Sequence, residues 1–428
     1  EMASGELNVR PIVNRLTKQK GKSTFKMYID HIHGSDLRFS YERLEHRNPE
    51  YGIDYYDMDI RNVECCLEDF KVVEGAVSAE IKEMYALERS GFEIDDLRGY
   101  FNVNMGVIEF ENFVARTKRS NISIPSFIID GENWNEYKQY IDMVDMRGRV
   151  ENSSLSTYDL GFFAPGVRKW DLTLSQVDGS FSGVVRDFMA YVTHAKVGNE
   201  TIVEADAQII GMPEWRTSEY IVSVKNLHTT AQDIELLSQR VTGKSLEPKV
   251  VEIVRNIKSA DVKGTFGGRL SSFRTAGNVV TPVGRLSADV EMRSVQAERY
   301  ALRGIVDTDN LHLGELLSIN SLGGLTSSIA MDGSVGAGGV VADLSVNVGS
   351  IGVGANRFNN ITAQGAIDHD TYVAEVHSND KNLSFDLNSI IDLGAYIPSY
   401  EVMLKLNRAD LNALGINKRD SLSVVSLE

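Results

Sequence analysis

Residue pairs that could bind a metal ion or form a disulfide are few. His31 and His33 form an H-x-H pair that would share one face of a strand, a spacing that can ligate a metal ion. The sequence places no third ligand beside them. Cys65 and Cys66 are adjacent, and neighbouring cysteines rarely satisfy disulfide geometry. We therefore predict no metal site, and we expect both cysteines to be ordinary strand residues.

Motifs for nucleotide binding or acyl transfer are incomplete. The glycine-rich stretches 333–339 and 349–354 lack the Lys-Ser/Thr pair of a phosphate-binding loop. Stretch 179–183 has phenylalanine at its centre, where a nucleophile elbow needs serine. Glu109 and Glu111 fit the solvated side of an alternating strand. These patterns predict that the protein is not an enzyme and has no cofactor.

Composition indicates a packed chain without nucleic-acid affinity. Of the 428 residues, 42% are hydrophobic and 24% charged, and the 36 glycines outnumber the 8 prolines, which suits many tight strand connections. The net charge of −16 argues against phosphate-backbone binding, which depends on Lys and Arg. No run of about 18 apolar residues occurs. We expect the chain to be an internal fragment of a longer protein, without its membrane anchor.

Alternation with a period of two dominates the sequence. Leu286, Ala288, Val290 and Met292 alternate with polar residues, and this pattern is typical of a strand with one apolar and one polar face. The same reading covers three further groups: Trp170, Leu172 and Leu174; Leu344, Val346 and Val348; Leu404 and Leu406. Because burial on one face favours antiparallel or solenoid sheets, we predict a mainly β fold with few short helices.

Helical patterns are short. The clearest is expected at 230–256, where Thr230 and Asp233 form a capping pair before apolar residues at helical spacing. Further short helices are predicted at 156–163, 310–317 and 134–141.

An internal repeat links these helices to a glycine-containing strand motif. The residues of the motif are Asp159, Gly179, Phe181 and Gly183 in one copy, Asp233, Gly264, Phe266 and Gly268 in the next, and Gly333 in a weaker third. The glycines are predicted to stand at strand starts and to allow tight corners. Their uneven spacing favours an open stack over a closed propeller.

The repeat and the alternation together predict the domain organisation. The predicted segments are an extended end at 1–24, a β-rich segment at 25–150, three repeat units at 151–225, 226–306 and 307–407, and the start of a further unit at 408–428.

These motifs resemble the TamB translocation and assembly module family, part of the AsmA-like, bridge-like lipid transfer group. The stretches that carry the resemblance are 158–165, 177–183, 211–213, 227–233, 262–273, 275–277 and 281–284. The resemblance implies an elongated sheet curled into an open taco with an apolar interior. It also implies a periplasmic location, a parent protein anchored in the inner membrane and reaching the outer membrane, and a TamA-like barrel partner.

Three functions are weighed on this basis. The first is an apolar groove for the acyl chains of phospholipid moving toward the outer membrane. Its predicted lining is Trp170, Leu172, Leu174, Leu286, Ala288, Val290, Met292, Leu344, Val346, Val348, Leu404 and Leu406. The second is a scaffold or chaperone that assembles outer-membrane β-barrel proteins by β-augmentation. The third is a β-solenoid enzyme such as a polysaccharide lyase, for which the sequence offers no carboxylate cluster.

Overall fold

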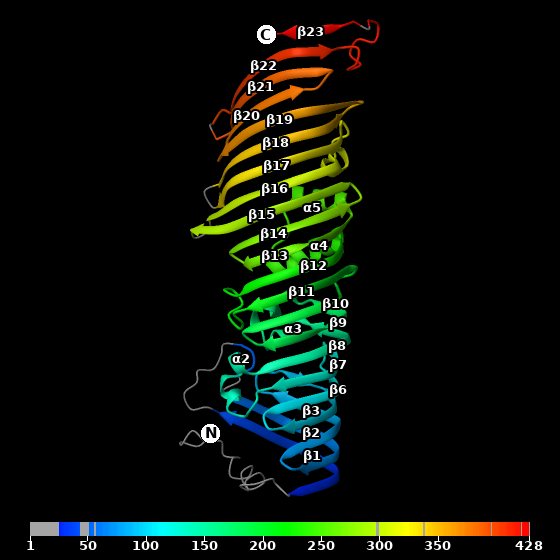
Figure 1. Cartoon of the computed structure of the whole chain (residues 1–428), viewed down its shortest axis with the longest axis vertical. Coiled ribbons are helices and arrows are strands. Elements are labelled where there is room, and N and C mark those ends of the chain that lie inside the picture. Colours follow the sequence, from blue (N-terminus) through cyan, green and yellow to red (C-terminus); the bar gives the residue numbers. More distant parts are fainter. Residues whose placement is uncertain are drawn as a thin grey trace. The chain divides into compact units, whose positions relative to one another are not determined.

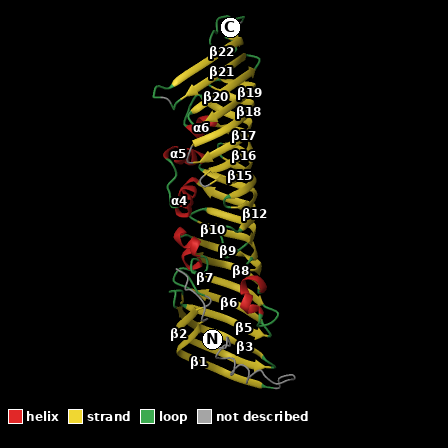
Figure 2. Cartoon of the chain, turned by 90° about the vertical axis from the view of Figure 1, so that its left-hand side faces the viewer, coloured by secondary structure: helices red, strands yellow, loops and turns green. Residues whose placement is uncertain are grey.

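The computed structural model describes residues 25–42, 51–54, 57–296, 299–336, 339–394, 396–420 and 422–427. They form antiparallel strands and a few short helices (Figures 1 and 2), which confirms the predicted mainly β class with an open sheet. The predicted N-terminal segment 1–24 lies outside the described residues. The chain divides into unit 1, residues 1–218 and 236–245, and unit 2, residues 219–235 and 246–428.

Unit 1 is a run of antiparallel strands that pair largely in chain order, with the two-residue β4 beside β3. Its strands are β1 (Lys26–Glu42), β2 (Asp57–Val73), β3 (Ala76–Glu88), β4 (Glu93–Ile94), β5 (Asp96–Asn104), β6 (Val107–Arg116), β7 (Asn121–Asp130), β8 (Asp145–Ser156), β9 (Thr173–Val184), β10 (Asp187–Val197) and β11 (Thr201–Ile210). Its helices are η1 (Glu136–Gln139), α2 (Tyr140–Met143), α3 (Thr157–Leu160) and η2 (Pro165–Trp170).

Unit 2 continues this pattern, each strand pairing antiparallel with the next. Its strands are β12 (Glu219–Thr230), β13 (Ser259–Arg269), β14 (Ser272–Thr281), β15 (Gly284–Gln296), β16 (Arg299–His312), β17 (Leu322–Gly336), β18 (Gly339–Val353), β19 (Asn356–Asp368), β20 (Thr371–Asn379), β21 (Leu383–Asp392), β22 (Ser399–Asp410) and β23 (Val424–Leu427). Its helices are α4 (Ala231–Thr242), whose later turns are grouped with unit 1, α5 (Pro248–Ile257) and α6 (Leu313–Leu317).

Local sequence accounts for the α4–α5 pair. Thr230 Oγ1 accepts from the backbone N–H of Asp233 at 3.4 Å, as the predicted capping pair requires. The first helix ends at Gly243, whose φ of +73° suits glycine, and Pro248 begins the second at a first-turn position. The helix expected at 230–256 is therefore present as two.

The helix expected at 134–141 is present as η1 and α2, and the other two predicted helices are shorter than expected. The one expected at 156–163 is the single turn α3, and the one at 310–317 begins only at Leu313. Each of α3, the α4–α5 pair and α6 joins an even-numbered strand to the following odd-numbered strand. Because successive antiparallel strands reverse direction, within each unit these connections lie at one edge of the sheet.

Candidate functional site: the charge-free face of the sheet

Strand register places the predicted apolar residues of unit 2 on one face. Directly opposite residues of an antiparallel pair project to the same side, so a face can be followed from strand to strand. Ala288 on β15 is opposite Val306 on β16, and the same row reaches Val346 on β18 and Leu404 on β22. All nine predicted lining residues of unit 2 fall on this face.

Four such rows cross the strands from β12 to β22. They run nearly perpendicular to the strands, each with one residue per strand. The first row is Tyr220, Gly268, Phe273, Met292, Leu302, Gly333, Ala342, Ile367, Tyr372, Ile391 and Tyr400. The second row is Val222, Phe266, Thr275, Val290, Gly304, Met331, Leu344, Gly365, Ala374, Ser389 and Val402. The third row is Val224, Gly264, Gly277, Ala288, Val306, Ile329, Val346, Ala363, Val376, Leu387 and Leu404. The fourth row is Leu227, Val262, Val279, Leu286, Thr308, Ser327, Val348, Ile361, Ser378, Phe385 and Leu406.

We call these four rows the charge-free face, because they contain no Asp, Glu, Lys, Arg or His. Several of their hydroxyl groups bond within the sheet. Thr308 Oγ1 lies 3.0 Å from Ser327 Oγ, and Ser378 Oγ donates to the Leu383 carbonyl at 2.7 Å. A buried hydroxyl that already has a partner presents little polarity to a ligand. The face therefore offers an apolar surface without a polar barrier across it.

The side chains of this face are neither sealed nor fully open to water. Eight of the nine predicted lining residues of unit 2 are half-buried, and Leu404 is 55% exposed. A layered globular core would bury such residues almost completely. The face is thus a concentrated apolar surface that is partly accessible to solvent, and such a surface is a candidate for binding.

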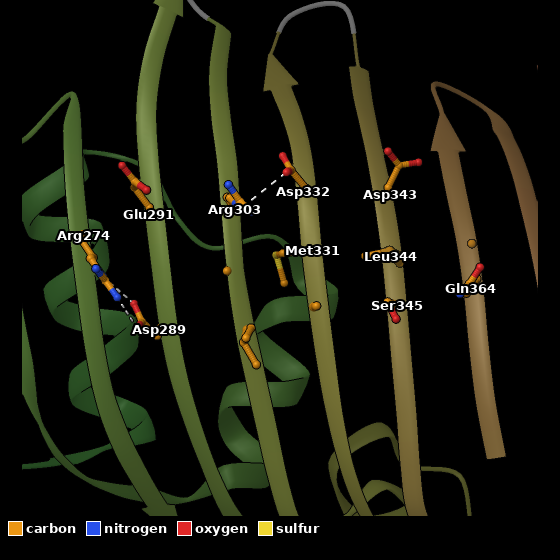
Figure 3. A pocket seen from close by; sticks show the side chains of 14 residues that line it. Arg274, Asp289, Glu291, Arg303, Met331, Asp332, Asp343, Leu344, Ser345 and Gln364 are labelled. Carbon is orange, nitrogen blue, oxygen red and sulfur yellow. Dashed lines mark hydrogen bonds and ion pairs between the residues drawn. The ribbon is translucent and has the colours of Figure 1, made fainter. Parts of the chain in front are cut away.

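The opposite face of unit 2 carries the charges. Figure 3 shows an open hollow of about 720 Å³ on strands β14 to β19, where Arg274 holds Asp289 and Arg303 lies 3.6 Å from Asp332. Hydrogen bonding from Arg274 lowers the pKa of Asp289. Because its arginines pair with its own aspartates, the hollow resembles a solvated face more than a site prepared for one charged ligand.

Unit 1 repeats the arrangement with aromatic residues. One row holds Ala79, Phe101, Phe110, Phe127, Gly148, Phe181, Ala190 and Ala207. The ring centroids of Phe110 and Phe127 lie 5.9 Å apart, and those of Phe127 and Phe181 lie 5.7 Å apart. A methyl group at Gly148 would come within 2.5 Å of the Phe181 ring, so glycine lets that ring cross β8. Most of this row was not predicted, although Phe110 does alternate in the sequence.

The predicted strand of Trp170, Leu172 and Leu174 is wrong in its first two residues. Trp170 ends the helix η2, and Leu172 precedes β9. Between them Asp171 has a φ of +47°, a left-handed conformation that breaks a strand. Leu172 is held instead by its carbonyl, which accepts from the Thr157 backbone N–H at 2.8 Å. Leu174 alone lies on a strand, opposite Leu155 and Val197.

The motif glycines stand inside strands and not at the strand starts that we predicted. A methyl group added at Gly179 would lie 2.3 Å from the carbonyl oxygen of Tyr191. At Gly264 the corresponding distance, to the carbonyl oxygen of Ala276, would be 2.5 Å, and at Gly333, to that of Val341, it would be 2.3 Å. Glycine is needed because the next strand approaches too closely for any side chain.

The motif phenylalanines pair diagonally across their hairpins. Phe181 lies 5.7 Å from Phe188, and Phe266 lies 4.9 Å from Phe273, between ring centroids. In each hairpin the second ring is opposite the closing glycine of the motif, Gly183 or Gly268. The motif therefore determines how the hairpin packs, because an aromatic ring fills the space beside a glycine.

The motif aspartates are buried at the start of their helices. Asp233 is fully buried, and Asp159 is 9% exposed. The Asp159 carboxylate accepts from the hydroxyl of Thr117 at 2.6 Å and from that of Ser120 at 2.5 Å, both in the β6–β7 turn. These bonds fix α3 against the neighbouring hairpin.

The described residues do not bring metal ligands together. His31 is opposite Glu68 across β1 and β2, with 3.7 Å between Nδ1 and Oε1, and His33 is opposite Cys66. No group of three His, Cys, Asp or Glu side chains in the described ranges could hold a metal ion. Among the helices that the structure describes, none has the length and apolar character needed to cross a membrane.

Comparison with models of protein families, with curated proteins and with solved structures found no match. The TamB resemblance, the periplasmic location and the four-part division of residues 151–428 therefore stay predictions.

Proposed function

We propose that the charge-free face binds phospholipid acyl chains, and that the chain is the periplasmic part of a TamB-like protein that moves phospholipid toward the outer membrane. The observation that carries the proposal is the four-row register, in which no charged residue interrupts the face from β12 to β22. Each methylene group transferred from water to such a surface contributes roughly 0.8 kcal/mol, so acyl chains need no specific polar contact.

The width of the face supports the same proposal. Four positions along a strand, spaced by two residues, span roughly 20 Å at about 3.3 Å per residue. This span accommodates acyl chains lying across the strands. Neighbouring strands at about 4.8 Å then extend the surface along the sheet without an end at any single strand. A surface of this form suits many copies of one lipid better than a single specific ligand.

The experiment compares two neighbouring positions on β18. Val346→Asp puts a carboxylate into the charge-free face, whereas Asn347→Asp puts the same group on the exposed opposite face of the same strand. We expect lipid carried through purification, measured by mass spectrometry, to fall by about tenfold or more in Val346→Asp, since an unpaired charge there costs a few kcal/mol. Asn347→Asp should retain the wild-type amount.

Transfer of a fluorescent phospholipid between vesicles provides the second readout. Val290→Asp and Val346→Asp should slow transfer, and Asn347→Asp should not. The proposal fails if delipidated wild-type protein neither retains nor transfers phospholipid, or if Val346→Asp and Asn347→Asp behave alike while both remain folded by circular dichroism.

A further inference from the structure

Two connections from opposite edges of unit 1 meet each other. Connection 157–172 joins β8 to β9, and connection 211–218 joins β11 to β12. Because β9, β10 and β11 reverse direction in turn, the chain enters β9 at one edge of the sheet and leaves β11 at the other. Even so, a methyl group at Gly166, in the first connection, would lie 2.8 Å from Cε2 of Trp215, in the second. We call this contact between the two edges the clasp.

Each side of the clasp is held by contacts at its own edge. Beside the tryptophan, the backbone N–H of Gly211 donates to the carbonyl oxygen of Arg186 at 2.7 Å. Beside the glycine, Arg168 donates to the hydroxyl of Tyr158 at 2.8 Å. The three atoms nearest to the methyl position at Gly166 all belong to the indole ring. A change of the tryptophan rotamer would therefore open the clasp without moving either backbone.

The clasp encloses a face of β9–β11 that carries no charge. Connections from opposite edges can meet only by passing over one face of the strands between them, and the side chains of that face are then the more buried. The row Phe181, Ala190 and Ala207 is half-buried, whereas Ser180 and Tyr191 on the opposite face are exposed. We call three rows without Asp, Glu, Lys, Arg or His the inner face: Gly183, Phe188 and Ile209; Phe181, Ala190 and Ala207; Gly179, Val192 and Ala205.

The position of the clasp matters for a lipid on the inner face. A phospholipid there would place its acyl chains against the apolar rows and keep its charged headgroup in water, because burial of an unpaired charge is costly. The headgroup would then project away from the sheet, between the two edges. The clasp lies between the same edges. A lipid moving from strand to strand would therefore meet the clasp with its headgroup, and could pass only when the clasp is open.

We propose that the clasp is a gate on phospholipid movement along the inner face, with the indole of Trp215 as its moving part. Glycine is required at position 166, since any side chain there would collide with the ring when the clasp is closed. The inference rests on the proposed function, because a gate acts only if lipid moves along the sheet. It adds to that function one position at which the movement is controlled.

One protein can be prepared with the gate open or closed. Gly166→Cys and Trp215→Cys are combined in a full chain carrying Cys65→Ala and Cys66→Ala, which removes both native thiols. A short bismaleimide with a cleavable linker joins the two new thiols, whereas N-ethylmaleimide caps them and leaves the edges unjoined. We expect the cross-linked protein to transfer fluorescent phospholipid between vesicles about tenfold more slowly than the capped protein, because a closed gate limits the rate. Cleavage of the linker should restore transfer.

Two single variants open the clasp without cross-linking. Trp215→Ala removes the ring, and Gly166→Val fills the space that the ring occupies. Both should transfer phospholipid at the wild-type rate or faster, and mass spectrometry should find the wild-type amount of bound lipid, because neither changes the inner face. Slower transfer by either variant, while circular dichroism shows it folded, would mean that the ring assists transfer and would overturn the gate.

The control cross-link lies within one connection. Glu214→Cys and Thr217→Cys, both at exposed positions, carry the same linker without joining the edges, so transfer should not change. If the cross-link between positions 166 and 215 also leaves transfer unchanged, or if both cross-links slow it equally, the gate is overturned while the proposed function stands, since transfer is still measured. If wild-type protein neither retains nor transfers phospholipid, the proposed function fails and the gate fails with it.

Discussion

At the scale of single residues, the motif glycines and phenylalanines set how closely successive strands approach. A methyl group at Gly264 would lie 2.5 Å from the carbonyl oxygen of Ala276. Glycine therefore allows β13 and β14 to approach this closely. Phe266 then packs against Phe273, with the two rings tilted and their centroids 4.9 Å apart. The packing of the β13–β14 hairpin, which is part of the charge-free face, therefore depends on both residue types.

Gly264→Ala should therefore destabilise unit 2 more than an identical change nearby. The new methyl group must displace the backbone of β14, which costs about 1–3 kcal/mol. Gly267→Ala on the same strand is the matched control, because its methyl group would meet no described atom within 4 Å. The midpoint of urea unfolding measures both. Equal midpoints for the two variants would contradict the role of Gly264.

His377 makes the stability of unit 2 depend on pH. The hydrogen bond to Asp386, 2.7 Å from Nδ1, is the main cause that raises the pKa of His377, and Glu375 at 3.1 Å from Nε2 adds to it. A histidine whose folded pKa exceeds its unfolded pKa, near 6.5, stabilises the fold fully below about pH 6.5. That contribution is lost as the pH rises through the folded value.

We expect the Tm of wild-type protein to fall between pH 6 and pH 8 more than that of His377→Gln. Asp386→Asn should flatten the dependence in the same way, since it removes the main partner of the imidazolium. Tm would be followed by circular dichroism in buffers of equal ionic strength. If Tm changes with pH to the same extent in wild-type protein and in His377→Gln, this histidine does not contribute to the pH dependence of stability.

At the scale of elements, short helices are attached to the sheet edge through buried polar groups. Asp159 is the clearest case, because its carboxylate joins α3 to the β6–β7 turn through two hydroxyl groups. Asp159→Ala would leave both hydroxyls without this acceptor, at a cost of about 2–4 kcal/mol. Asp159→Asn keeps one oxygen and should lose less.

Hydrogen exchange distinguishes a local from a general effect of these variants. In Asp159→Ala we expect faster exchange across 157–164 and 117–120, with the strands of unit 2 unchanged. Asp187→Ala is a suitable control, because that residue is exposed and its hydrogen bond with Gln208 joins β10 to β11, away from both monitored segments. Uniformly faster exchange in Asp159→Ala would mean that the residue supports the whole unit and not the helix.

The sequence predicts elements well where one local rule decides them. Alternation identifies β15, β18 and β22 because a strand with one apolar and one polar face has a period of two. It fails at Trp170 and Leu172, since nothing in the alternation reveals the left-handed turn at Asp171. It also cannot show that Ala288 and Val346 share a face, because register depends on turn geometry and on bulges several strands away.

At the scale of the whole molecule, apolar surface is arranged in rows and not collected into a closed core. Among the described residues, many of the buried hydrophobic side chains are small, and Ala79, Ala195, Ala260 and Ala409 are examples. Most of the larger side chains of the charge-free face are half-buried, whereas Tyr372, Tyr400, Val402 and Leu404 are exposed. Folding is therefore supported by backbone pairing and by partial burial along each strand, with less complete dehydration than in a globular domain.

This arrangement has a calorimetric consequence. The heat capacity change on unfolding rises with the apolar area newly exposed, and globular proteins give about 12–15 cal/mol/K per residue. Delipidated protein should give a smaller value per residue, because its apolar rows are already partly in contact with water when folded. The quantity comes from urea unfolding at several temperatures, which avoids aggregation on heating. A value inside or above the globular range would mean that the charge-free face is covered in solution, as it would be by retained lipid. Repeating the measurement after further delipidation would test for that cover.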